Sequence, residues 1–478
     1  MQSSGPRMMN RDSAQNSLLW LVGAGFFMET LDSTIVNTAL PAMAKSLHES
    51  PLAMHSVVVT YSLTIAILIP ASGWIADRLG TRRTFFSAIL LFSIGSLLCA
   101  CSQSVPQLVA ARVVQGIGGS MLLPVGRLAV LRNFPGELYL PAISFVSIPG
   151  LIGPLIGPTL GGWLVSIATW HWIFLINLPV GLLGCLATLK LMPDNRNESP
   201  GHFDGTGYAI LAVSMLAVSL SIDGLSDVGS RHASVHLLMI FGLSALAAYW
   251  LHASRSEHPL FSLKLFRIHT FSIGLLGNLF ARIGSGSMPF LIPLFLQIGL
   301  KYSPMGAGMM MIPVAAAGIA SKRGTPPLIR HFGYRRVLVV NTWLVGLSVA
   351  SFAFIGETEP LWLKLFQLFF FGAVNAFQFT AMNSLTLTDL GKAESSSGNS
   401  LFSMVQLLSM SLGVAAGGAL LNAFTRQISA SGETEAILRA FHYTFLSEGF
   451  ITCSSSWIFY QLVPGVSRRG AEGVALRH

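Results

Sequence analysis

The stretch Gly73-Trp-Ile-Ala-Asp77-Arg78-Leu-Gly80-Thr-Arg82-Arg83 is a polar loop between two long apolar segments, and it has a partial copy later in the chain. The copy is Arg330-His-Phe-Gly333-Tyr-Arg335-Arg336, in which the glycine and both arginines match at a constant offset. Eight apolar segments separate the two copies, whereas two adjoining halves of six helices would separate them by six. We therefore expect two related six-helix halves, in parallel orientation, with a pair of helices inserted between them.

Fourteen apolar segments are long enough to cross a bilayer, because about 20 apolar residues in a helix span the hydrocarbon core. These segments, each placed to within a few residues, are 17–39, 55–76, 84–103, 107–130, 140–165, 171–192, 206–224, 235–252, 271–296, 304–321, 336–355, 361–384, 400–424 and 443–463. The prediction is an all-α polytopic membrane protein of about fourteen transmembrane helices. Its expected parts are a cytoplasmic tail, an N-terminal six-helix bundle, linkers with two additional helices, a C-terminal six-helix bundle and a second cytoplasmic tail, at 1–16, 17–192, 193–270, 271–463 and 464–478.

Composition supports a membrane protein over a soluble one. Hydrophobic residues make up 52% of the 478 residues and charged residues only 10%, against about 25% charged in a soluble domain. The net charge of +9 does not indicate nucleic-acid binding, since the basic residues fall in short clusters between the apolar segments. With a cytoplasmic N-terminus, 21 of the 29 Lys and Arg residues lie in cytoplasmic segments and six on the other side. This bias predicts that both termini are cytoplasmic.

Several functional classes lack their sequence signals. There is no Gly-x4-Gly-Lys-Ser/Thr loop, so we expect no ATP-driven pump. The four cysteines and the histidines form no metal-ligand spacing, so we expect no metal or other cofactor. No nucleophile–base set stands in the apolar segments, which argues against an embedded enzyme.

The first apolar segment carries two acids, Glu29 and Asp32, three residues apart and therefore on one face of a helix. A charged carboxylate is costly at membrane depth, so a buried acid there is a plausible proton carrier. The alternative is that one acid reaches the outer interface or forms a structural pair. Asn37, five residues after Asp32, is a candidate for the substrate path.

The fourth segment contains Arg112-Val-Val-Gln115-Gly-Ile-Gly-Gly119. An arginine inside a membrane helix must face the protein interior or water, and Arg112, Gln115 and Gly119 share one helical face. Arg112 could stabilise the charge of a nearby acid, and Gln115 could line the substrate path. A structural ion pair is the alternative for Arg112.

The loop quoted first suggests a gate. Asp77 lies near a helix end among arginines, so its carboxylate can pair with a guanidinium and hold one conformation. The alternative is a topology-determining basic cluster with an incidental acid. We expect Gly73 to allow two helices to approach closely. In the second copy Arg330 replaces the acid, so an equivalent latch is not expected there.

The fifth segment repeats glycine every four residues, at Gly153, Gly157 and Gly161, which predicts a bare stripe for close helix contact. Pro154 and Pro158 remove backbone donors and permit bending, and Gly162 follows the stripe. Packing alone and a flexible interface between the halves are both compatible with this pattern. In the second half, the candidates for a substrate path are Arg282, Asn278, Asn375 and Gln378, although helix packing uses such residues too.

These motifs resemble those of a known family. The loop at 73–83 resembles the signature loop of the major facilitator superfamily, and Leu31-Asp-Ser-Thr-Ile-Val-Asn-Thr-Ala-Leu-Pro41 resembles the first-helix motif of its 14-helix drug/proton antiporter branch. The strings Leu260-Phe-Ser-Leu-Lys-Leu-Phe-Arg267 and Leu296-Gln-Ile-Gly-Leu300 resemble the MdtD-like group of multidrug exporters in that branch. The resemblance favours Asp32 over Glu29 as the functional acid. It also implies gating by the Asp77 loop.

Two further resemblances bear on coupling and direction. Arg112-Val-Val-Gln115-Gly116 resembles a superfamily motif assigned to proton coupling, and the glycine-proline segment at 149–162 resembles a motif of exporters. They imply proton-driven efflux of small amphipathic or cationic compounds across a bacterial inner membrane by a monomer. Two alternatives stay open: a proton-coupled exporter of one metabolite, such as an amino acid or siderophore, and a non-transporting membrane receptor or scaffold.

Overall fold

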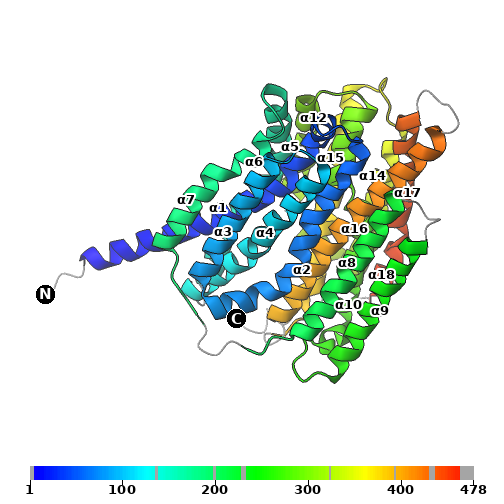
Figure 1. Cartoon of the computed structure of the whole chain (residues 1–478). Coiled ribbons are helices and arrows are strands. Elements are labelled where there is room, and N and C mark those ends of the chain that lie inside the picture. Colours follow the sequence, from blue (N-terminus) through cyan, green and yellow to red (C-terminus); the bar gives the residue numbers. More distant parts are fainter. Residues whose placement is uncertain are drawn as a thin grey trace.

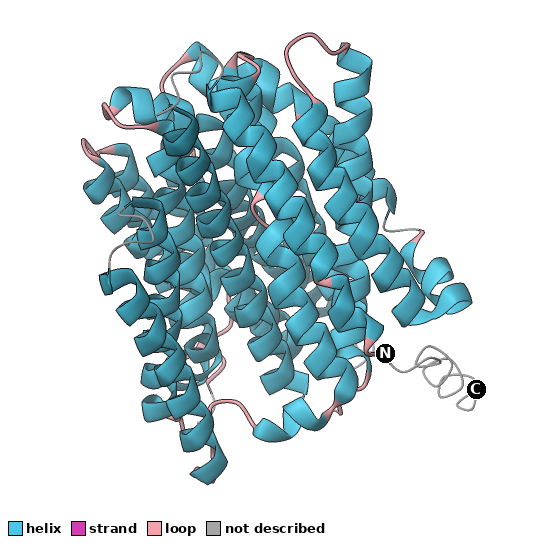
Figure 2. Cartoon of the chain, turned by 90° about the vertical axis from the view of Figure 1, so that its right-hand side faces the viewer, coloured by secondary structure: helices cyan, strands magenta, loops and turns pink. Residues whose placement is uncertain are grey.

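The computed structural model describes residues 5–134, 138–196, 201–227, 233–321, 324–391, 395–429 and 436–462, and this part of the chain is helical throughout (Figures 1 and 2). The predicted tail at 464–478 lies outside the described residues. The predicted tail at 1–16 belongs, from Gly5 onward, to the first helix. Figure 2 shows the helices running side by side with loops at the two ends of the bundle.

The first half is formed by the first seven helices of the chain. Their bounds are α1 Gly5–Ser46, α2 His55–Leu79, α3 Thr81–Ala100, α4 Val105–Asn133, α5 Tyr139–Ile167, α6 Trp172–Leu175 and α7 Asn177–Leu191, with a short turn η1 at Pro51–Met54. Helix α1 packs on α4, α5 and α7, and α4 packs on α2 and α3. These contacts gather α4, α5 and α7 around α1, which carries the predicted acids.

Two inserted helices and a second half follow. The inserted helices are α8 Gly205–Asp227 and α9 Ala233–Arg255. The second half comprises η3 Leu263–Arg267, α10 His269–Ser285, α11 Met288–Leu294, η4 Phe295–Gly299, α12 Pro304–Met310, α13 Ile312–Ser321, α14 Thr325–Ser351, η5 Phe352–Phe354, α15 Leu361–Thr388, α16 Ser395–Ser429, α17 Ala436–Ser454 and α18 Ser456–Tyr460. Here α10 packs on α15, α16 and α17.

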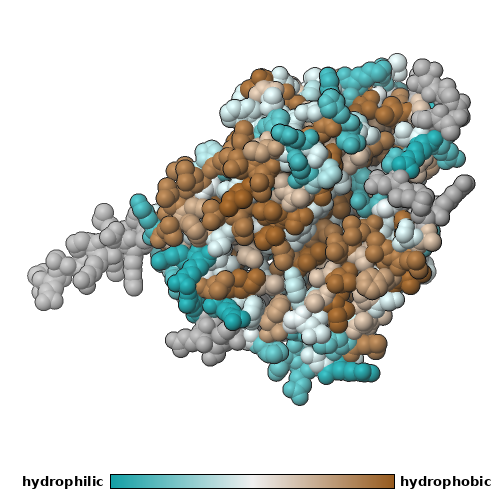
Figure 3. Space-filling model, viewed as in Figure 1, coloured by the Kyte–Doolittle hydropathy of each residue, from teal (hydrophilic) through white to brown (hydrophobic). Residues whose placement is uncertain are grey.

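The fourteen-helix prediction is confirmed. Within the described residues, thirteen helical segments are long and apolar enough to cross a membrane, and they match the first thirteen predicted segments. The fourteenth is α17 with α18. Helix α17 carries Arg439, His442 and Glu448, which lower its hydropathy, yet it packs against α10, α14 and α16 within the bundle. An apolar belt crosses the middle of the molecule, with hydrophilic residues gathered towards its ends (Figure 3).

The inserted pair docks on both halves. Helix α8 packs on α9 and also contacts α2 of the first half and α16 of the second. Between the two inserted helices, Ser214 and Ser221 donate hydrogen bonds to the carbonyl oxygens of Gly242 and Val235. His55 at the start of α2 contacts the Asp223 carboxylate of α8 at 2.7 Å.

The predicted internal repeat has a structural counterpart. Gly80 stands between α2 and α3 with φ 90° and ψ 151°, and Gly333 kinks α14 with φ 78° and ψ 156°. Both values lie in a region that residues with a Cβ atom rarely adopt. The glycine of the motif is therefore needed for the same sharp turn in each half.

Candidate functional site

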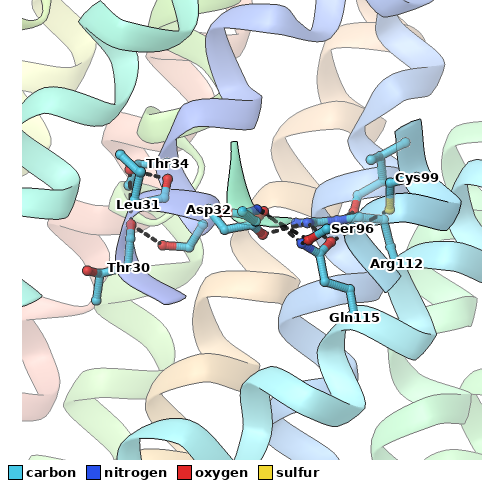
Figure 4. Close-up of polar contacts among 11 residues, drawn as sticks. Thr30, Leu31, Asp32, Thr34, Ser96, Cys99, Arg112 and Gln115 are labelled. Carbon is cyan, nitrogen blue, oxygen red and sulfur yellow. Dashed lines mark hydrogen bonds and ion pairs between the residues drawn. The ribbon is translucent and has the colours of Figure 1, made fainter. Parts of the chain in front are cut away.

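A buried polar cluster joins four helices of the first half (Figure 4). Asp32 of α1 lies at its centre, with Arg112 and Gln115 of α4, Ser96 of α3 and Asn177 of α7 around it. The exposed fraction is 0% for Asp32, Ser96 and Gln115, 1% for Arg112 and 2% for Asn177. The sequence places these residues up to 145 positions apart, so the helix packing alone brings them together.

The Asp32 carboxylate receives three hydrogen bonds. Arg112 donates from Nη1 to Oδ2 at 2.7 Å, and Gln115 donates from Nε2 to Oδ1 at 2.8 Å. Asn177 adds a donor to Oδ1 at 3.1 Å. A buried ion pair is tolerated only when further hydrogen bonds satisfy both partners. This arrangement meets that requirement for the charged form of Asp32.

The Arg112 guanidinium is held on several sides. Besides Asp32, Nη1 contacts Gln115 Oε1 at 2.6 Å, and Nε donates to the Val57 carbonyl at 3.3 Å. The Tyr61 ring lies 3.9 Å from the guanidinium carbon, a cation–π contact. The pairing inferred for Arg112 from the sequence is therefore present, and Gln115 belongs to the same cluster.

Glu29 differs from Asp32 although it lies less than one turn away on α1. Its side chain is buried, at 5% exposed, but it forms no hydrogen bond or ion pair with the described residues. Asn37, a predicted substrate-path residue, is also buried, and its Oδ1 has no hydrogen-bond partner in the described part of the chain. Of the two acids, Asp32 is thus the one built into a cluster.

The predicted gating loop contacts the first half and the linker that follows α7. Asp77 pairs with Arg132 at the end of α4 rather than with an arginine of the loop. Arg78 stacks on Trp74 at 5.2 Å, and Arg82 donates to the Met192 carbonyl.

The remaining residues of the predicted gating loop differ in their surroundings. A Cβ atom on Gly80 would lie 2.2 Å from Asp194 Oδ1, so the loop packs closely on the segment after α7. Arg83 is exposed. The prediction for Gly73 is wrong for the described part of the chain: none of its atoms lies within 4 Å of the place the Gly73 Cβ would occupy, so no close helix contact there depends on this glycine.

The glycine stripe of α5 packs on α1. A Cβ atom would lie 2.4 Å from Thr30 Oγ1 at Gly153, and 2.3 Å from Thr34 Oγ1 at Gly157. At Gly161 it would lie 2.5 Å from the Ile35 carbonyl oxygen. The stripe thus lies in close contact with α1, the helix that carries Asp32.

The other edge of α5 faces the second half. A Cβ atom on Gly162 would lie 2.2 Å from the Pro304 carbonyl oxygen of α12, and one on Gly308 would lie 2.5 Å from the carbonyl oxygen of Pro158. Thr159 donates to the Gly308 carbonyl at 3.0 Å. Pro154 and Pro158 leave α5 as one continuous helix from Tyr139 to Ile167. The glycine-proline segment of α5 thus packs on α1 along one edge and contacts the second half of the protein along its other edge.

The predicted polar residues of the second half form no cluster with an acid. Arg282 is buried, bonds Asn278 Oδ1 through Nε at 3.2 Å, and stacks on Phe379 at 4.5 Å, with no ion pair among the described residues. Gln378 bonds Asn341 and Thr342 of α14, which is helix packing. Asn375 is half-buried.

Two cluster residues, Asn177 and Ser96, were not predicted from the sequence, and neither was Glu448 of α17, a buried acid outside the cluster. The role of Asn177 depends on the α1–α7 contact. Ser96 gave no signal. Glu448 did give one, since it is an acid within a predicted membrane segment.

Two further features lie away from the Asp32 cluster. A cavity of about 1230 Å³ opens beside the second copy of the loop, lined by Arg330, Arg335, Phe377 and Tyr460 among others. Among the described residues, no group of three His, Cys, Asp or Glu side chains is arranged to hold a metal ion. Neither feature adds chemistry to the cluster.

Comparison with known proteins agrees with this geometry. The family model described as Major Facilitator Superfamily matches residues 22–414. A Pectobacterium atrosepticum protein named "Putative multidrug resistance protein MdtD" is 52% identical over 446 residues, covering 93% of this chain and 95% of the relative. A protein of the same name from Escherichia coli O8 is 50% identical over 445 residues, covering 92% and 93%.

Solved structures show the same fold at low identity. A peptide transporter POT in complex with sulfate aligns with a TM-score of 0.68 at 16% identity, covering 94% of this chain and 95% of that one. A D-xylose-proton symporter aligns with a TM-score of 0.67 at 13% identity, covering 95% and 98%. Fourteen helices in two bundles, the repeated glycine turn, the family match over most of the chain and the two close relatives lead to one conclusion: this chain is a multi-pass membrane transporter of the major facilitator superfamily, not an enzyme.

Proposed function

We propose that this transporter exports small amphipathic or cationic compounds across a bacterial inner membrane in exchange for protons, with both termini in the cytoplasm. The observation that carries the proposal is the Asp32 cluster, in which a fully buried carboxylate has a guanidinium and two amide donors. The names of the relatives support a multidrug class of substrate, and the distribution of Lys and Arg supports the orientation.

The cluster explains how a proton and a conformational change would be linked. In the arrangement seen here the donors stabilise ionised Asp32, because each of its oxygens accepts a hydrogen bond. Protonation would remove the charge that holds Arg112, Gln115 and Asn177 in place. Since these three side chains come from α4 and α7, the proton would loosen the contacts of α1 with both helices.

The same change would reach the interface between the halves. Helix α1 packs on α5 through the glycine stripe, and α5 contacts α12 at Gly162 and Gly308. Gln297 of the second half also donates to the Thr38 carbonyl of α1 at 2.9 Å. A shift of α1 is therefore transmitted to the second half through two independent contacts, which fits rocking of two bundles around a site between them.

The direct test is Asp32→Asn in proteoliposomes, with ethidium as the transported probe and an imposed pH gradient as the driving force. The amide has nearly the same shape but cannot exchange a proton at these pH values, so we expect at least a tenfold loss of gradient-driven flux. Glu257→Gln, which changes an exposed acid after α9, is the matched control and keeps the full rate. Gradient-driven flux in Asp32→Asn at the normal rate, with the normal pH response, contradicts the proposal.

A further inference from the structure

Glu448 of α17 is a second buried acid, and its surroundings are unlike those of Asp32. It is 0% exposed, and neither carboxylate oxygen has a hydrogen-bond partner in the described part of the chain. The neighbouring Ser287 hydroxyl donates instead to the Gly284 carbonyl at 2.8 Å. An ionised carboxylate without a donor is very costly in such a place. The geometry therefore favours the neutral, protonated acid in this conformation.

The acid lies beside the junction of two helices. Helix α10 ends at Ser285 and α11 begins at Met288, and Gly286 and Ser287 between them keep backbone angles near the helical region, with φ −74° and −71°. The two helices therefore belong to one membrane span with a local irregularity. A Cβ atom on Gly417 of α16 would lie 2.8 Å from the Ser287 side chain and 3.2 Å from Glu448 Oε1, so Ser287 and the carboxyl group lie close to the same point of α16.

The backbones around Glu448 pack closely. The α10 and α17 backbones meet at Gly284, where a Cβ atom would lie 2.6 Å from the Glu448 carbonyl oxygen and 2.0 Å from Thr452 Oγ1. Among the described residues, no group of three His, Cys, Asp or Glu side chains is arranged to hold a metal ion. A proton is therefore the ligand that this isolated carboxyl group can carry.

No other ionisable group faces Glu448 from the described helices packed against α17. On α10 the nearest is Arg282, whose guanidinium is directed to Asn278 and Phe379. On α14 the residues beside Gly449 are Gly346 and Ala350, and no ionisable residue stands between 341 and 351.

The remaining helices give the same result. On α16 the ionisable residue is Arg426, nine positions beyond Gly417, or about 13 Å along a helix. On α17 itself His442 bonds the Ile355 carbonyl, and Arg439 lies further along the helix. On α18 Tyr460 stacks with Trp457, and η4 and η5 carry no ionisable residue.

We propose that Glu448 is a second proton-carrying carboxyl of the transport cycle, in the second half and separate from Asp32. The inference rests on the proposed proton-driven function. Helix α11 contacts α1 of the first half, so the shift of α1 proposed above displaces the α10–α11 junction relative to Glu448. Water that enters at the junction accepts the proton as the O–H bond breaks, and the Ser287 hydroxyl turns from Gly284 to donate to the carboxylate.

Infrared difference spectroscopy of the full-length protein in a lipid film, titrated from acid to alkali, tests the protonation state without any substrate. Wild type should keep the carbonyl stretch of a protonated carboxyl well above about pH 4, where exposed acids ionise, and should lose it as the pH rises further. Buried Glu29 also lacks a partner among the described residues, so the variants are compared in a Glu29→Gln background. There Glu448→Gln should lack this band and Glu448→Asp should shift it. Asp32→Asn and the exposed-site control Glu257→Gln should retain it.

Ethidium flux as a function of pH then tests the transport role. Glu448→Gln should reduce the response of the flux to an imposed pH gradient at least fivefold, while Glu448→Asp restores part of it. A band that persists at full intensity into strong alkali, a band absent at neutral pH, or a wild-type pH response in Glu448→Gln would each overturn the inference. If wild type moves no ethidium, the proposed function fails, whereas the infrared titration still decides whether Glu448 exchanges its proton.

Discussion

The sixth membrane helix of each half meets the first helix of that half, but the chemistry at the two contacts is reversed. In the first half α7 supplies an amide, Asn177, which donates to the acid on α1. In the second half α17 supplies the acid itself, Glu448, and the α10–α11 junction brings Ser287 close to it. One acid is surrounded by donors, whereas the other accepts no hydrogen bond from the described residues.

The buried arginines of the two halves differ in the same way. Arg112 forms an ion pair with Asp32, whereas Arg282 is buried with an amide and a phenyl ring as its neighbours. Among the described residues, each half therefore has a buried arginine and at least one buried acid, but only in the first half do the two form an ion pair. A shared fold therefore does not impose a shared arrangement of charges. The first half holds an ionised acid, whereas the second half holds a neutral one.

Removal of each arginine should give the largest difference between the halves. Arg112→Met leaves Asp32 charged, buried and without its cation, which costs about 3–5 kcal/mol. Arg282→Met removes a buried charge that has no acid, so we expect a change within about 1 kcal/mol. Thermal unfolding midpoints of the purified variants in detergent measure both effects. Equal losses of stability in the two variants would show that Arg282 has an acid partner in solution.

The fifth helices offer a smaller effect that should be similar in both halves. Gly157 of α5 lies against Thr34, and Gly413 of α16 lies against the Arg282 carbonyl oxygen, where a Cβ atom would be 2.7 Å away. Valine at either position overpacks the contact and should destabilise the protein by about 1–3 kcal/mol.

Gly73→Val is the matched control for both glycines, since nothing lies within 4 Å of its Cβ position. We expect its unfolding midpoint to equal that of wild type in the same thermal assay. A loss in Gly73→Val as large as in Gly157→Val would mean that α2 closes on another helix in a second conformation, where the predicted role of Gly73 would apply.

The sequence was sufficient to predict the fold and only part of the site. Apolar length revealed the fourteen spans, and the repeated loop revealed the two halves. Asp32, Arg112 and Gln115 were visible because a charge or amide in a membrane helix is costly and therefore notable. Their mutual contacts were not visible, since they depend on which faces of α1, α3, α4 and α7 meet.

The misses have the same physical origin. Asp77 was expected to pair with a guanidinium, but the sequence did not identify the partner, Arg132, which stands 55 positions later at the end of α4. Gly73 was expected to mediate helix contact, yet it faces open space in this conformation. Spacing within one helix reports which residues share a face, whereas the neighbour of that face is set by tertiary packing.

Substitutions in the two copies of the loop should have the smallest effect on stability. The substituted residues carry opposite charges, since Asp77 of the first copy corresponds to Arg330 of the second. Asp77 pairs with Arg132 while both side chains are partly exposed, at 30% and 24%, and exposed pairs contribute about 0–1 kcal/mol. Asp77→Asn should therefore shift the unfolding midpoint only slightly, and Arg330→Gln, which changes the exposed residue standing in place of the acid, should not shift it.

Transport separates the two variants further. If the Asp77 contact gates the first half, ethidium flux falls several-fold in Asp77→Asn and stays at the wild-type rate in Arg330→Gln. Equal flux in the two variants would mean that the loop acts only as a basic topology signal. A gating contact needs the acid, whereas a topology signal needs only the cluster of positive charges.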